Sequence, residues 1–347
     1  MNAQQERKSQ KVSSLLLEMI RKGDYAMATK KRMGGVLLIL GFALLSMLLG
    51  TLQLASSALA KTTPLPRTWQ AVAGIQSANQ EIQGMAFLPG ALWVNVGDTV
   101  VWTAKNNYVH TVTFLRPGQK PPPFNLFDPL QGMPQGSHTY DGVSYYNSGF
   151  MNALGILPGG KGYSLTFAVA GDFTYYCLFH SSMMTGIVHV RAAGTSYRYS
   201  QADYNHQIEQ STASLMHDGM KLADWAEDHE SKQQVILGVG DGKVSVMRFF
   251  PQSVTTHVGQ TVTFTNHDPM ESHTVTFGAD QPQSVYAPYG NPKAFDGSAP
   301  LNSGYLGTNA AWFGKSFSVT FLKAGTYAFR CDLHDQMGML LNVVVLP

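Results

Sequence analysis

The strongest constraint on the fold of this 347-residue chain is an internal repeat. Short segments of its middle recur in the same order near its C-terminus, over more than a hundred residues. The clearest pairs are His-Thr-Val-Thr-Phe at 110–114 and 273–277, Asn-Ser-Gly at 147–149 and 302–304, and Ala-Gly at 170–171 and 324–325. The last pair precedes Cys177 and Cys331, the two cysteines of the chain. Self-similarity at this period predicts two copies of one domain.

Each copy alternates apolar and polar residues with a period of two, which is typical of strands that bury one face. Leu165, Phe167 and Val169 would share a face in the first copy, as would Phe317, Val319 and Phe321 in the second. Glycine- and proline-rich turns separate these runs, so we expect an all-β fold of antiparallel sandwiches or barrels. The predicted domains are residues 75–193 and 236–347.

A polar segment, residues 194–235, lies between the copies and is predicted to be a partly helical linker. Ser200 and Asp203 fit a capping pattern at a helix N-terminus. Tyr204, Ile208, Leu215 and Leu222 follow at spacings that could form one apolar stripe. A shorter linker is expected at residues 61–74.

Late in each copy the spacing Cys-x-x-His-x-x-Met brings together residue types that bind copper. The first copy provides Cys177, His180 and Met183. The second provides Cys331, His334 and Met337. One histidine stands far upstream in each copy, His110 or His273. A thiolate, two imidazoles and a weak thioether suit copper that changes between Cu(I) and Cu(II).

These motifs resemble the cupredoxin family, which includes plastocyanin, azurin and amicyanin. The resemblance covers nearly everything outside the N-terminal segment and the linkers. It implies two tandem Greek-key β-sandwich domains, one type 1 (blue) copper per domain, and electron transfer. The ligands that it implies are His110, Cys177, His180 and Met183 for the first ion, and His273, Cys331, His334 and Met337 for the second.

The axial methionine stays open in both copies. Met183 and Met184 both follow His180, and azurin-like spacing would select Met184. The second copy offers Met337 and Met339. Met183 is preferred because it repeats the spacing of Met337. A disulfide between the cysteines is not expected, since it would need their α-carbons within about 7 Å and the cysteines occupy equivalent places in separate domains.

Three functions are compatible with two such copper sites. An electron carrier that serves redox partner proteins is the function we expect, without enzyme activity. Copper storage, delivery or sensing would use the same ligands. A relative of the two-domain nitrite reductases or small laccases would need a further metal centre built from His-x-His pairs and a histidine beside the copper cysteine. The sequence contains no His-x-His pair and no histidine next to either cysteine.

The first sixty residues predict export. Residues 1–34 form a basic tail, and residues 35–60 are an uncharged, largely apolar segment that reads as a transmembrane helix or a signal peptide. Lys30, Lys31 and Arg32 precede it, so the rest of the chain is expected outside the cytoplasm, either anchored to the membrane or secreted after cleavage at Ala60. The remaining residues carry 16 basic and 19 acidic side chains. This balance argues against nucleic-acid binding.

Overall fold

The computed structural model describes residues 65–125, 127–231, 233–279, 287–307 and 314–347, with the side chain of Ser182 left aside. The basic tail and the predicted transmembrane or signal segment, residues 35–60, lie outside these ranges. Among the described residues no helix is both long and apolar enough to span a bilayer. Residues Lys61–Pro347 make up one compact unit, and this unit contains both copies of the repeat.

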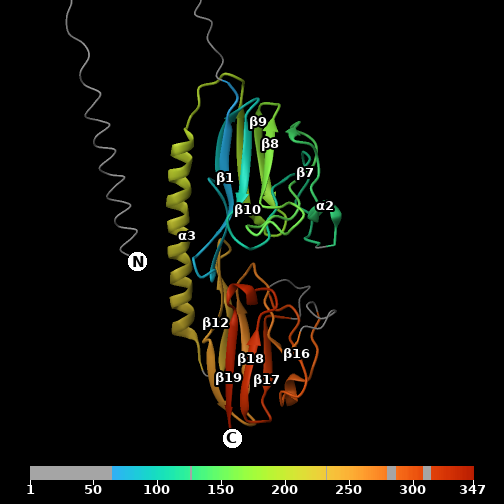
Figure 1. Ribbon diagram of the computed structural model, residues 1–347, viewed down its shortest axis with the longest axis vertical. Helices are drawn as coiled ribbons and strands as arrows, with labels where there is room; N and C mark the ends of the chain where they lie inside the picture. The colour runs from blue at the N-terminus through green and yellow to red at the C-terminus, as the bar shows by residue number, and fades with distance from the viewer. Residues whose placement is uncertain (1–64, 126, 232, 280–286, 308–313) are drawn as a thin grey trace, which may run out of the picture. The chain divides into compact units, whose positions relative to one another are not determined.

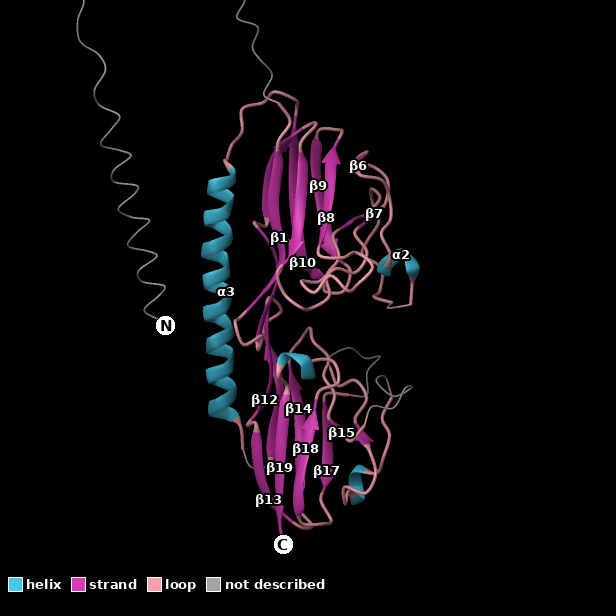
Figure 2. Ribbon diagram, viewed as in Figure 1, coloured by secondary structure: helices cyan, strands magenta, loops and turns pink. Residues whose placement is uncertain are grey.

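The predicted all-β architecture is confirmed, because strands build both copies (Figure 2). The strands of the first copy are β1 Thr68–Gln76, β2 Ile82–Leu88, β3 Ala91–Asn95, β4 Thr99–Ala104, β5 Thr113–Phe114, β6 Thr139–Tyr140, β7 Tyr146–Asn147, β8 Gly162–Phe167, β9 Gly171–Cys177 and β10 Ser181–Arg191. Those of the second are β11 Gln234–Gly240, β12 Val244–Phe250, β13 Ser253–His257, β14 Thr261–His267, β15 Thr276–Phe277, β16 Leu301–Asn302, β17 Ser316–Thr320, β18 Gly325–Arg330 and β19 Leu340–Leu346.

Each domain is a sandwich made from half of one shared sheet and a sheet of its own. The shared sheet has nine strands in the order β17-β14-β11-β12-β2-β1-β4-β8-β6. The first domain adds the sheet β3-β10-β9-β5-β7, and the second adds β13-β19-β18-β15-β16. The two halves of the shared sheet join where β12 pairs with β2, with Val244 opposite Gly84 and Val246 opposite Ile82. A continuous hydrogen-bonded ladder therefore connects the domains.

Two details of the strands differ from the expectation. Strand β1 begins at Thr68, inside the range 61–74 that was predicted to be a linker, and it pairs with both β2 and β4. The pairing is also mixed rather than purely antiparallel, since β1 with β4 and β3 with β10 are parallel, as are β11 with β14 and β13 with β19. Parallel neighbours arise because the chain crosses between the two sheets before it returns.

The predicted linker contains one long helix, α3 Gln201–His229, which packs against β1, β2, β11 and β12 and so contacts both domains (Figure 1). The predicted cap is present: the side chain of Ser200 accepts from the backbone of Asp203, whose carboxylate accepts from the backbone of Ser200. Gly219 faces the β2–β12 junction, where a side chain would collide with Ile82. The absence of a Cβ therefore lets the helix lie close to the seam between the domains.

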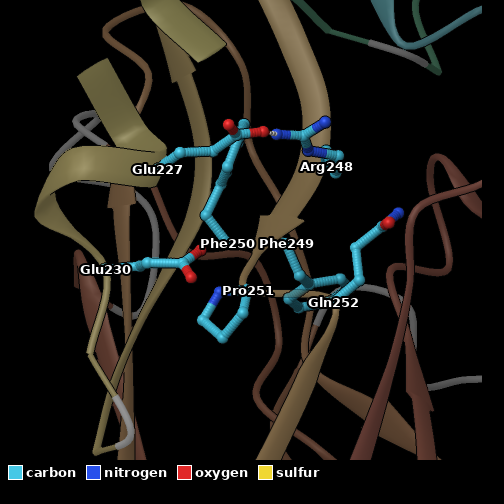
Figure 3. Close-up of a pocket in the computed structure, with 7 residues that line it drawn as sticks. All are labelled: Glu227, Glu230, Arg248, Phe249, Phe250, Pro251 and Gln252. Carbon is cyan, nitrogen blue, oxygen red and sulfur yellow. Dashed lines mark hydrogen bonds and ion pairs between the residues drawn. The ribbon is translucent and has the colours of Figure 1, made fainter. Parts of the chain in front are cut away.

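The two ends of α3 are attached to different domains. Near its start, the Tyr204 hydroxyl accepts from the backbone N–H of Trp93 in the first domain at 2.7 Å. Near its end, Glu227 pairs with Arg248 on β12 of the second domain (Figure 3). Glu230 lies beside this pair, and burial together with the charge of Glu227 raises its pKa. Through these contacts the helix holds the two domains together across their junction.

Candidate metal centres

The first predicted centre is assembled by three segments of the first domain. His110 lies between β4 and β5, Cys177 ends β9, and His180 lies in the turn that leads into β10. The Cys177 Sγ lies 3.2 Å from His180 Nδ1 and 3.9 Å from His110 Nδ1. All three residues are buried. The structure therefore brings together the predicted thiol and both predicted imidazoles.

The second centre repeats this arrangement. The Cys331 Sγ lies 3.4 Å from His334 Nδ1 and 3.9 Å from His273 Nδ1. The two Nδ1 atoms are 3.1 Å apart in a fully buried site. Within each centre the candidate ligand atoms all lie within 4.8 Å of one another. Both cysteines are free, so the expected absence of a disulfide between them holds.

The hydrogen bonds around each sulfur are also repeated. The backbone N–H of Thr111 donates to Cys177 Sγ at 3.4 Å, and that of Thr274 donates to Cys331 Sγ at 3.3 Å. The hydroxyl of Thr111 accepts from the backbone of Leu178 at 2.8 Å, which ties the strand of the upstream histidine to the ligand turn. Donors aimed at a sulfur stabilise its thiolate form and fix its orientation.

A glycine makes room for the upstream histidine of each centre. Gly74 lies at a bulge of β1 with φ +68°, and a Cβ there would come within 2.2 Å of His110 Nε2. Gly238 lies at the matching bulge of β11 with φ +72°, and its Cβ would come within 2.2 Å of His273 Nε2. Both the left-handed backbone and the close approach of the ring require glycine.

Comparison with known proteins identifies the chain. The model of the family described as copper binding proteins, plastocyanin/azurin family, matches residues 75–191 and again residues 233–346. The chain belongs to this family. The matches fall on the two sandwiches and leave α3 between them.

Individual relatives match about one domain. Chloroplastic plastocyanin of Oryza sativa subsp. indica is 35% identical over 113 residues, which make up 33% of this chain and 62% of that relative. Plastocyanin of Scenedesmus fuscus is 32% identical over 111 residues, 32% of this chain and 96% of the relative. A solved structure of a mutant fern plastocyanin covers 32% of this chain and 98% of its own, with 22% identity and a TM-score of 0.22.

The donor sets of this family member fit copper. A thiol and two imidazole nitrogens converge in each buried centre, close enough together to hold one metal ion, and in the second centre the two Nδ1 atoms lie 3.1 Å apart. In the first centre the Nε2 of His110 lies 2.8 Å from the amide oxygen of Asn106. An amide oxygen only accepts, so Nε2 carries the proton and Nδ1 keeps its lone pair for a metal. The chain thus provides two copper sites.

The predicted methionines are placed differently in the two centres. Met337 is buried, on the 3-10 helix η2 Asp335–Met337, but Met339 is buried as well. In the first centre the side chain of Met183 is 48% exposed, and its Cε lies against Gly242 of the second domain. The neighbouring Met184 is 1% exposed and packs in the same core as Cys177. Met183, the predicted axial ligand, is thus the more exposed of the two methionines that follow His180.

The first centre has a charged environment. Burial alone would raise the pKa of Cys177, but the charge of His180 and the hydrogen bond with its imidazole hold that pKa well below its ordinary value. Burial alone would lower the pKa of His180, whereas the Cys177 thiolate and the Glu271 carboxylate raise it above its ordinary value. The Cys177 thiolate and the charged form of His180 therefore stabilise each other.

In the second centre the pKa values of the equivalent cysteine and histidine shift in the opposite directions. Burial raises the pKa of Cys331 to about 11, and burial lowers the pKa of His334 to about 4. Because a metal binds the thiolate, copper must displace a proton from Cys331 in this centre.

Several residues that shape the centres were not singled out from the sequence. They are Gly74, Gly238, Asn106, Tyr108 and Glu271. Tyr108 and Glu271 carry a sequence signal all the same, because each stands two residues before the upstream histidine of its domain. Gly74 and Gly238 do not stand out in the sequence, because many other glycines occur in turns of this chain.

Proposed function

We propose that this protein transfers single electrons through two type 1 copper ions and is not an enzyme. The observation that carries the proposal is the pair of enclosed His-Cys-His sets with repeated surroundings. Copper bound there would supply a one-electron change between Cu(I) and Cu(II). The protein's own part is to hold the imidazoles and the thiolate in one arrangement, since a fixed geometry limits the rearrangement that accompanies each electron. Redox proteins are the proposed partners.

A redox titration of the copper-loaded protein tests this function. We expect two coppers per chain, an intense visible absorption, and reversible one-electron oxidation and reduction at both centres. Copper that leaves the protein on reduction, or a colourless loaded protein, would instead support storage or delivery. Electron transfer is favoured over storage by the burial of the ligands, because every histidine and cysteine of the two sets is at most 4% exposed.

We propose further that Met184 is the axial ligand of the first centre. Strand β10 is irregular between Ser181 and Thr185, and Thr185 pairs with Tyr176, the residue before Cys177. Met184 directly precedes this pair, and it is buried. The irregularity therefore turns Met184, and not Met183, toward the core that contains the cysteine.

The second domain supports the same assignment for Met339. Leu340 pairs with Arg330, the residue before Cys331, and Met339 directly precedes this pair. The backbone carbonyl of Met339 accepts from the N–H of Cys331 at 3.1 Å. Met184 and Met339 thus occupy equivalent positions beside the two cysteines, although their sequence distances from the cysteines differ.

Leucine substitutions distinguish the candidate axial ligands. Met184→Leu should shift the visible spectrum and raise the potential of the first centre, because an apolar group in place of a thioether disfavours Cu(II). Met339→Leu should do the same for the second centre. The matched controls Met183→Leu and Met337→Leu should leave spectrum and potential nearly unchanged. If Met183→Leu or Met337→Leu shifts the spectrum and potential instead, that methionine is the axial ligand of its centre, as the Cys-x-x-His-x-x-Met spacing predicts.

A further inference from the structure

A buried pair of side chains from equivalent positions, Tyr108 and Glu271, lies between the two copper sites. Tyr108 belongs to the first domain and is 7% exposed, and Glu271 belongs to the second and is 2% exposed. The Tyr108 hydroxyl donates to the Oε2 of Glu271. This hydrogen bond crosses between the domains at the level of the metal ligands.

The ring of Tyr108 contacts one copper-ligand histidine from each domain. Its centroid lies 5.5 Å from that of His180, with the rings stacked at 27°. It lies 5.4 Å from the centroid of His334, with the rings tilted by 33°. His180 and His334 are the equivalent histidines that follow the cysteine in each domain. One aromatic ring therefore separates a ligand of the first centre from a ligand of the second.

Glu271 holds this arrangement in place. Its Oε1 lies 3.3 Å from the Nε2 of His180, the ring nitrogen that faces away from Cys177. Its backbone is fixed in turn, since its N–H donates to Asp268 at 3.0 Å and its carbonyl accepts from Asn266 at 2.8 Å. A buried carboxylate is costly unless its hydrogen bonds are made, so these contacts favour a single position of Tyr108 between the histidines.

The geometry points to a role for this pair: the Tyr108 ring, positioned by Glu271, is the path along which an electron passes between the two copper centres. This inference rests on the proposed function. With copper bound by both sets of ligands, one electron would pass from Cu(I) at one centre to Cu(II) at the other, so one copper would be oxidised and the other reduced. No bond forms or breaks, and Tyr108 keeps its proton. A redox partner that docks at one domain then has access to both coppers.

The strength of such a path is measurable in the fully oxidised protein by pulsed electron paramagnetic resonance. Two Cu(II) ions interact through space by a dipolar term, which depends on their separation. They also interact by an exchange term, which depends on the orbitals of the groups between them. The dipolar term reports the separation of the two centres, and the exchange term reports the groups that connect them. One experiment therefore shows whether Tyr108 connects the centres electronically or only holds the domains in place.

Three variants test the path. Tyr108→Leu should lower the exchange term severalfold while the dipolar separation stays the same. Tyr108→Phe keeps the ring and should keep most of the exchange term. The control Phe179→Leu removes a ring that contacts Tyr108 and His180 from within the first domain, and it should change neither term. The rate at which one photochemically introduced electron equilibrates between the centres should fall in Tyr108→Leu. It should stay nearly unchanged in Tyr108→Phe and Phe179→Leu.

An unchanged exchange term in Tyr108→Leu would overturn the inference, as would loss of that term in Tyr108→Phe. If Tyr108→Leu does not fold or changes the dipolar separation, loss of the exchange term in Tyr108→Phe or in Phe179→Leu would still overturn the inference. Copper content and redox titration of the same samples test the proposed function separately. Two reversible coppers without a Tyr108-dependent exchange term would leave that function standing and remove only the path.

Discussion

Replacing Cys177 with serine is expected to abolish the intense visible absorption of the first copper centre and to leave that of the second intact. The Cys177 thiolate is the strongest soft donor among the ligands of this centre, and serine has no sulfur with which to replace it. Each set of ligands belongs to one domain, with His110 and His180 around Cys177 and their counterparts around Cys331. About half of the absorption of the loaded protein should therefore remain.

Cys331→Ser is the matched variant for the second centre. Each single variant should bind one coloured copper, and the double variant should bind none. Visible spectra with copper counted per chain provide the measurement. Loss of both coloured coppers in one single variant would mean that the two sites depend on each other for binding, contrary to the separate ligand sets.

Replacing Gly74 with alanine is expected to destabilise the first domain and to weaken or abolish copper binding there. A residue other than glycine at this positive φ costs about 1–3 kcal/mol from backbone strain alone. The added Cβ would also come within 2.2 Å of His110 Nε2 and 2.4 Å of the amide oxygen of Asn106. His110 would have to move, and its hydrogen bond to Asn106 would be lost.

Gly160→Ala provides the control for this experiment. Gly160 has a similar φ of +65°, but nothing lies within 4 Å of the position of its Cβ. Gly160→Ala should lower the unfolding temperature because of backbone strain, and it should keep its full copper content. Gly238→Ala should reproduce the full effect at His273 and the second centre. Thermal unfolding together with copper content of each variant gives the comparison, and full copper binding by Gly74→Ala would contradict the expectation.

The cysteine and histidines of each centre could be predicted from the sequence, because their positions depend on short spacings along the chain. Cys177 and His180 lie on one strand and the turn that follows it, so three residues of spacing bring both toward the same point. The repeat adds the upstream His110 and His273, since each begins an identical His-Thr-Val-Thr-Phe segment. Local spacing and duplication therefore predict two β-sandwich domains and six of the proposed ligands.

The axial methionine could not be chosen by spacing. In a strand, neighbouring side chains point to opposite faces, and one irregularity reverses which residue faces inward. The irregular stretch between Ser181 and Thr185 buries Met184 and exposes Met183. Such a change of register depends on pairing with another strand, so the sequence of the turn alone does not reveal it.

The contact between the domains depends on still longer-range structure. The sequence shows that Tyr108 and Glu271 hold matching positions in the two copies, but not that they meet. They meet because β2 pairs with β12 and α3 packs over both strands, which joins the two domains along this seam. The sequence determined the cysteine and the two histidines that gather in each domain. The tertiary structure alone decided that one buried tyrosine ring lies between the two centres, because packing between domains is settled by the whole surface that they share.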